Sequence, residues 1–241
     1  MTTDTAPEVL RVETPEEFRT MPEEYQELAT HQMMVHTEGE LSGADDYLQI
    51  FFPIAPSAYE RKVCCERAAE EVDHYMIGAA VLNDLGIDTD YMLHQKLMER
   101  GLYASPAIHK IKTWPQRALF SYLGEDAVLD HIREMAQSSY RPWADSFDKV
   151  IKDELVHVGH GRRIVRELIR TPEGRAEVQA TLDRMWPFIL SLFGSDTSTR
   201  SPKYLRWGLR QKTNAQARAD FVARVVPELR RIGLTVPGPA A

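Results

Sequence analysis

The chain has 241 residues, of which 43% are hydrophobic and 27% are charged, and it carries a formal net charge of −7. This composition is typical of a globular protein, and the negative charge argues against nucleic-acid binding, which requires a basic surface. No run approaches the roughly 18 apolar residues of a membrane-spanning helix. The adjacent Cys64 and Cys65 cannot link distant segments, as expected in a reducing compartment. The first residues lack a secretory signal pattern, so we expect a cytoplasmic protein.

The first half of the chain predicts an irregular arm and two long helices. Residues 1–20 are polar and contain two prolines, which favours an irregular arm. A first helix is predicted from Met21 to about residue 50. Pro22 follows Met21, and proline is favoured in the first turn of a helix. Pro53 and Pro56 then end it. Residues 60–82 contain no proline and many good helix formers, and they predict the second helix.

The second half continues the helical pattern. Residues 87–113 are mixed and are expected to hold short helical pieces. Further helices are predicted over residues 113–139, 142–170, 171–194 and 214–233, with a loop over 195–202. No alternating pattern of a strand occurs anywhere. The sequence therefore predicts an all-α protein, with residues 1–241 as a single domain.

A short motif occurs twice, once in the second helix and once in the fourth. Glu71 and His74 form one Glu-x-x-His pair, and Glu154 and His157 form the other. Residues three apart share a helix face, so each pair presents a carboxylate and an imidazole in one direction. Two such pairs, with one more carboxylate from each of two other helices, are the ligand set of ferritin-like di-metal bundles. We therefore predict a ferritin-like four-helix bundle with additional C-terminal helices.

The positions of the turns indicate the remaining two carboxylates. Residues at one level of an antiparallel helix hairpin lie symmetrically about its turn. The break at residues 53–57 lies midway between Glu40 and Glu71, and the turn before Pro142 lies midway between Glu125 and Glu154. By the same criterion, Glu38 remains an alternative to Glu40.

The pattern of the third helix supports Glu125. This residue interrupts an otherwise apolar stripe, whereas its neighbour Asp126 shares a stripe with Asp130 and Arg133 and is predicted to lie on the surface. Buried carboxylates are costly without cations, and two divalent metal ions would balance four of them. A shell rich in carboxylates with two imidazoles suits iron or manganese. Iron is favoured, since the open positions of a carboxylate-bridged pair suit O₂ activation, and manganese or a mixed pair is the lesser alternative.

Several segments outside these motifs resemble one known family. They are Met21–Tyr25, His36–Gly43, Ser139–Pro142, Met185–Pro187 and Gly233–Pro237. In a single register they are similar to the catalytic subunit of the phenylacetyl-CoA epoxidase, a ferritin-like di-iron oxygenase, from about Met21 to Pro239. The resemblance implies Glu40 as the first-helix ligand. The complete predicted set is Glu40, Glu71, His74, Glu125, Glu154 and His157.

The resemblance also implies an activity and partners. A di-iron centre with O₂ as co-substrate would insert one oxygen atom into an aromatic CoA thioester, served by a separate reductase and a homologous helical subunit. The sequence has no Gly-x-Gly-x-x-Gly fingerprint and no cysteine cluster, so electrons would have to come from another protein. The alternatives are a ferroxidase or other iron-binding ferritin-like protein and a non-catalytic scaffold subunit. A homo-oligomer is equally compatible with the sequence.

Two further features have competing interpretations. The stretch 200–218 carries six basic residues and no acidic one, which indicates either a site for CoA phosphates or an acidic partner, or an ordinary solvated face. His36 and His160 lie within one turn of predicted ligands, and either can orient a ligand or serve as an ordinary polar residue.

Overall fold

The computed structural model describes residues 10–101 and 108–237. In these ranges the chain is helical and contains no strand, apart from one isolated bridge between Val12 and Tyr140. The all-α prediction is therefore confirmed. Within the same ranges, no helix is both long and apolar enough to cross a bilayer.

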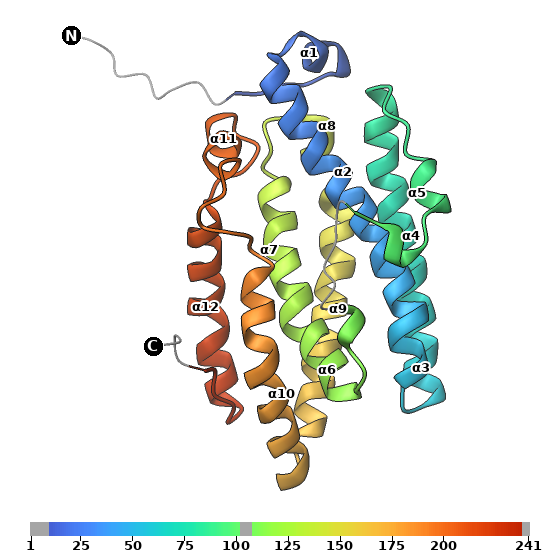
Figure 1. The fold of residues 1–241 in the computed structure, drawn as a ribbon, viewed down its shortest axis with the longest axis vertical. Coiled ribbons are helices and arrows are strands. Elements are labelled where there is room, and N and C mark those ends of the chain that lie inside the picture. Colours follow the sequence, from blue (N-terminus) through green and yellow to red (C-terminus); the bar gives the residue numbers. More distant parts are fainter. Residues whose placement is uncertain (1–9, 102–107, 238–241) are drawn as a thin grey trace, which may run out of the picture.

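Four long helical stretches form the bundle that holds the two motifs (Figure 1). The α2 helix packs against α4, and α7 packs against α9. Their bounds are α2 (Glu23–Asp46), α4 (Ala58–Asp84), α6 (Trp114–Leu119) continued by α7 (Glu125–Met135), and α9 (Phe147–Leu168). Both Glu-x-x-His pairs thus lie on bundle helices, one on α4 and one on α9.

Two of these stretches contain a π-helical turn. Residues Tyr47–Phe51 form one between α2 and α3 (Phe52–Ile54), and Phe120–Gly124 form the other between α6 and α7. Such turns accommodate an extra residue, are rare, and occur frequently at functional sites. The sequence analysis predicted uninterrupted helices here, because hydrophobic periodicity does not distinguish one wider turn from regular helix.

Hydroxyl caps explain where several helices begin. The side chains of Ser57, Thr113, Thr171 and Thr213 each accept a hydrogen bond from the backbone N–H three residues later. This contact satisfies one of the N–H groups that a helix leaves unpaired at its start. The predicted starts near residues 113 and 171 are confirmed by these caps.

The remaining helices are shorter or lie after the bundle. They are α1 (Pro15–Thr20), α5 (Tyr91–His94), α8 (Arg141–Ala144), α10 (Pro172–Ser191), α11 (Ser201–Arg206) and α12 (Asn214–Arg231), with 3₁₀ turns at Leu97–Glu99 and Ile108–Lys110. The prediction of an irregular arm was wrong for α1, where Thr14 caps the helix and Phe18 is buried. A cap followed by proline at the first position is a helix-start signal that outweighed the polar composition. Residues 1–9, at the start of the predicted arm, lie outside the described ranges.

The C-terminal helices cover the side of the bundle formed by α6 and α7 (Figure 1). Arg224 of α12 donates hydrogen bonds to Asp126 and Asp130 of α7. Asp126 is consequently only 3% exposed. Its predicted place on the surface was wrong, because a helix almost one hundred residues later in the chain packs over that stripe.

Two apolar clusters occupy opposite halves of the bundle. One contains Tyr47 and Tyr122 with the side chains of α10 and α12, and the other contains Met33 and Trp143 with those of α1 and α8. Along each bundle helix, the predicted ligands fall between residues of these clusters. The polar centre therefore lies inside the molecule with apolar packing on both sides.

The α9 helix approaches the second π turn unusually closely at Gly161. A Cβ at this position would lie 2.4 Å from the backbone nitrogen of Tyr122 and 2.6 Å from the carbonyl carbon of Ser121. Backbone atoms held in a helix cannot give way as a flexible side chain can. Glycine is thus required for α9 to pack against this turn.

We expect Gly161→Ala to lower the free energy of unfolding by about 1–3 kcal/mol, as overpacking does elsewhere. Gly159→Ala is the matched control, since a Cβ there meets nothing within 4 Å. It should be neutral or stabilising by up to about 1 kcal/mol, the difference in helix propensity. Denaturant unfolding of both variants tests this. Equal stability of the two would contradict the close approach.

Candidate metal centre

Four of the six predicted ligands converge in the middle of the bundle. Glu40 of α2, Glu71 and His74 of α4, and Glu154 of α9 each offer one ligand atom, and these atoms all lie within 4.8 Å of one another. All four side chains are buried. Carboxylate oxygens and an imidazole nitrogen at this separation are a donor set that could hold a metal ion.

The other two predicted ligands lie beside this cluster. His157 Nδ1 lies 3.5 Å from both Glu71 Oε1 and Glu154 Oε1. Glu125, at the start of α7, lines the same cavity as Glu40, Glu71 and Glu154. Neither His157 Nδ1 nor Glu125 Oε2 has a hydrogen-bond partner in the described ranges, although both are buried. The structure therefore places all six side chains at one level of the bundle.

Each motif histidine is oriented by an acidic residue of the opposite motif. The Nε2–H of His74 donates to Asp153 at 3.1 Å, and that of His157 donates to Glu70 at 2.8 Å. These acids immediately precede Glu154 and Glu71. A hydrogen bond at Nε2 leaves Nδ1 directed at the centre and fixes the ring orientation, as outer carboxylates do for metal-bound histidines. The doublets Glu70-Glu71 and Asp153-Glu154 were a signal for this arrangement that the sequence analysis missed.

The two π turns supply donors to the carboxylate of Glu125. Tyr47 from the first turn donates its hydroxyl to Oε1 at 2.8 Å, and Ser121 from the second turn donates to the same oxygen at 3.1 Å. The shared oxygen is thereby held in place and Oε2 stays available. The sequence alone provided no signal for this role of Tyr47.

His36 contacts the centre, whereas His160 does not. The Nε2 of His36 lies 2.9 Å from Glu40 Oε1, and its ring packs against Trp143 and Phe147. The Nε2 of His160 instead lies 2.9 Å from Glu60 Oε2, and Glu60 belongs to the first turn of α4. Of the two histidines that the sequence left open, only His36 can orient a predicted ligand.

Burial and mutual repulsion set the protonation of the centre. Burial raises the pKa of Glu71 and Glu154 well above the ordinary value, and repulsion from Glu40 adds to the shift. Burial raises the pKa of Glu40 as well, but His36 and His74 outweigh it and hold that pKa well below the ordinary value. Burial lowers the pKa of His74, yet its contacts with Glu40 and Glu71 raise it to about 11. These shifts favour the protonated forms of Glu71, Glu154 and His74.

A small cavity adjoins the carboxylates, with a volume of about 60 Å³. Its apolar wall consists of Phe51, Phe120, Ile108 and Val128. Both π turns contribute to this wall. The carboxylates therefore face a small cavity whose remaining wall is apolar.

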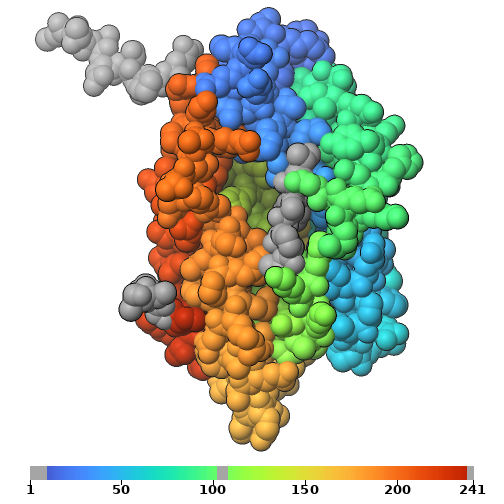
Figure 2. Space-filling view, viewed as in Figure 1, coloured from blue at the N-terminus to red at the C-terminus, as the bar shows by residue number. Residues whose placement is uncertain are grey.

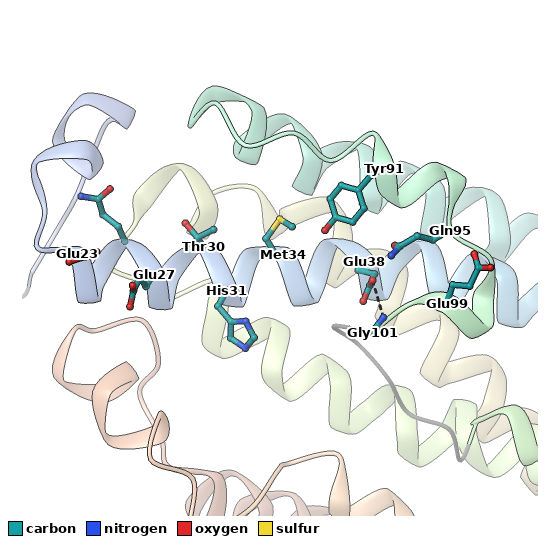
Figure 3. A pocket seen from close by; sticks show the side chains of 11 residues that line it. Glu23, Glu27, Thr30, His31, Met34, Glu38, Tyr91, Gln95, Glu99 and Gly101 are labelled. Carbon is teal, nitrogen blue, oxygen red and sulfur yellow. Dashed lines mark hydrogen bonds between the residues drawn. The ribbon is translucent and has the colours of Figure 1, made fainter.

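Glu38, the rival of Glu40, faces another part of the molecule. It is buried, accepts a hydrogen bond from the backbone N–H of Gly101 at 3.3 Å, and lines a pocket on the outer side of α2 (Figure 3). Glu23, Glu27 and Glu99 line the same pocket, so its charge is negative. On the same face of the molecule, Figure 2 shows a hollow between α2 and the C-terminal helices with α7 at its floor.

Most of the basic stretch 200–218 is neutralised by acidic side chains elsewhere. Lys203 and Arg206 both pair with Glu24 of α2, while Lys212 pairs with Asp220 and Arg218 with Asp196. Three carboxylates thus pair with four of the six basic residues of this stretch. The structure therefore favours an ordinary solvated face over a site for CoA phosphates.

Comparison with known proteins assigns the family. The family model described as "Phenylacetic acid catabolic protein" matches residues 8–241. The chain belongs to this family. It is similar to one of the subunits of the 1,2-phenylacetyl-CoA epoxidase of Escherichia coli (strain K12), with 24% identity over 222 residues that cover 91% of this chain and 72% of that protein. The predicted resemblance is confirmed, and it supports a role for this member of the family among the oxygenases.

We expect the metal-free protein to lose stability as the pH rises. Glu71, Glu154 and His74 have raised pKa values in the folded state, so the folded protein binds more protons than the unfolded chain. The free energy of unfolding therefore falls above the unfolded carboxyl pKa of about 4.3. Between about pH 6 and about pH 8 the melting temperature should drop by roughly 2–4 °C for each kcal/mol lost.

Thermal melts with a chelator present would measure this slope. Glu71→Gln removes one of the titrating groups and should flatten the curve. Added divalent metal should reverse the slope, because metal ions compete with these protons. A metal-free stability that rises with pH would contradict the proton assignment.

Proposed function

We propose that the protein is a di-iron, O₂-dependent monooxygenase that inserts one oxygen atom into an aromatic acyl-CoA or a related substrate. The single observation that carries the proposal is the convergence of four carboxylates and two imidazoles inside a bundle of this family. The proposed metal ligands are Glu40, Glu71, His74, Glu125, Glu154 and His157.

The residues present fit two metal ions. His157 Nδ1 and Glu125 Oε2 are buried without partners in the described ranges, which is costly unless another group binds them. Four carboxylates with two neutral imidazoles balance the charge of two divalent ions. Oxygen-rich shells with imidazole suit iron, and manganese or a mixed pair is the alternative.

When bound, the iron ions would supply the reductive activation of O₂. The chain's own residues prepare the site for it. Asp153 and Glu70 hold the histidines with Nδ1 inward, and Tyr47 and Ser121 hold Glu125. Phe51 and Phe120 keep bulk water away from the cavity. Orientation by such outer contacts typically changes metal affinity or activity 10–100-fold.

The proposal includes partners and a location. The described ranges hold no residues arranged for a flavin or an iron–sulfur cluster, and both cysteines are free. Electrons would therefore come from a separate reductase. A homologous helical subunit, or further copies of this chain in a homo-oligomer, would complete the assembly. We place this assembly in the cytoplasm and treat the chain as one ferritin-like domain.

The first experiment is the metal content of protein purified without added metal. About two iron ions per chain are expected for a di-iron bundle. O₂ consumption with a reductase and an aryl-acyl-CoA, matched by an oxygenated product, would support the monooxygenase. Iron oxidation without product would indicate a ferroxidase. Absence of metal after anaerobic loading with ferrous iron would indicate a scaffold subunit.

We expect Glu71→Ala and His157→Ala to abolish turnover and to lower the bound iron from about two ions to less than one. Both side chains face the centre, so helix content should remain near that of the wild type. Glu66→Ala is the control on the same helix, because Glu66 is exposed and pairs only with Lys62 among the described residues. Circular dichroism, metal analysis and O₂ uptake check the outcome. Full activity in either site variant would exclude the proposed ligand set.

A further inference from the structure

A buried acid that the proposed ligand set does not use lies at the end of α2. Asp46 is 3% exposed, and its Oδ1 accepts no hydrogen bond from the described residues. A buried carboxyl oxygen without a hydrogen-bond partner costs stability, so the presence of an acid at this position calls for an explanation. The side chain of Asp46 makes no helix-capping hydrogen bond, so the local helix does not require an acid at this position.

Asp46 separates two hollows of the protein. On one side it lines the cavity of about 60 Å³ that also contacts Glu40 and Glu125. On the other side it faces His109, whose Nε2 lies 3.9 Å from Asp46 Oδ1. His109 lines a second, open pocket of about 720 Å³ bordered by Asp45 and Arg100. Asp46 is thus positioned between that open pocket and the metal centre.

The imidazole of His109 is free to move toward Asp46. Its side chain is 24% exposed, and its Nδ1 is buried without a partner in the described ranges. The present 3.9 Å separation is about 1 Å longer than an N–H···O hydrogen bond. A proton can cross this gap when the two side chains approach by about 1 Å or when a water bridges them.

The groups around Asp46 favour its protonated form. Burial raises the pKa of this carboxyl well above the ordinary value, and the charges of Asp45 and Glu125 add to the effect. Arg100 opposes it, but its guanidinium donates to Asp45 at 2.7 Å rather than to Asp46. A carboxyl group in its protonated form can donate a proton into the cavity.

We propose that Asp46 and His109 form a proton path from the open pocket to the metal cavity. This inference rests on the proposed function. Monooxygenation consumes O₂, two electrons from the reductase and two protons, and releases one oxygen atom to the substrate and the other as water. The path supplies those protons: Asp46 gives one to the cavity, and His109 returns one from solvent.

The cavity has room for the last part of the path. An ordered water requires roughly 10–15 Å³ of such space. The volume of about 60 Å³ therefore admits a short chain of waters between Asp46 and the ligand carboxylates. Tyr47, at the next position in the chain, directs its hydroxyl to Glu125 and lines the same space.

The first test needs no turnover. An infrared difference spectrum of wild type minus Asp46→Asn at neutral pH should show the carbonyl band of a protonated carboxyl group. Glu134→Gln is the control, because Glu134 is also a buried carboxyl group but accepts two backbone N–H bonds, at 2.7 and 2.9 Å, and lines neither of the two pockets that Asp46 separates. No protonated band attributable to Asp46 would overturn the proposal.

The second test measures access of solvent protons. After transfer to heavy water, the Asp46 band should shift at least about tenfold more slowly in His109→Phe than in wild type, one rate decade being about 1.4 kcal/mol. His94→Phe is the matched control, since this exposed histidine borders the same pocket without facing Asp46. Equal exchange in all three proteins would exclude His109 from the path.

The third test measures whether the proton path contributes to catalysis. Asp46→Asn should lower O₂-dependent turnover at least tenfold, change its pH profile and solvent isotope effect, and leave the bound iron unchanged. Asp46→Glu, which keeps a carboxyl group, should recover part of the rate. Normal turnover with a normal pH profile in Asp46→Asn would overturn the proposal. A wild type that takes up no O₂ would overturn the proposed function, while the infrared tests would still decide whether the proton path exists.

Discussion

The burial of four carboxylates at one level of a helical bundle is the constraint on which the rest of this structure depends. Glu40, Glu71, Glu125 and Glu154 lie between two apolar clusters, where isolated negative charges are strongly unfavourable. The surrounding residues reduce this cost with hydrogen-bond donors, imidazoles and, in the metal-free state, protons. His157 Nδ1 and Glu125 Oε2 remain buried without a hydrogen-bond partner among the described residues.

The donors come from places where the helices depart from regular geometry. A regular α-helix advances about 100° per residue, so an extra residue in one turn rotates every later side chain by that amount. Tyr47 and Ser121 lie in the two π turns, and both donate to a single oxygen of Glu125. The same turns contribute Phe51 and Phe120 to the wall of the cavity. The irregularities of the backbone therefore coincide with the centre.

The outer contacts of the centre form a symmetrical pattern. Each Glu-x-x-His motif is preceded by an acid that orients the histidine of the other motif, so α4 and α9 support each other's imidazole. Glu70 and Asp153 are partly exposed, which connects the buried histidines to the outer face of the bundle. The chain carries all six of the proposed ligands, and its identity to the epoxidase protein of Escherichia coli is 24%.

The amino-acid sequence by itself indicated the long helices, the two motifs and the pairing of α2 with α4 and of α7 with α9. These features depend on neighbouring residues or on a constant helical period, so they can be read locally. The tertiary structure decided what depends on distant segments. Arg224 buries Asp126, Glu24 neutralises Lys203 and Arg206, and His109 lies beside Asp46. It also decided the π turns, because close packing such as that of Gly161 on Tyr122, rather than periodicity, selects a wider turn.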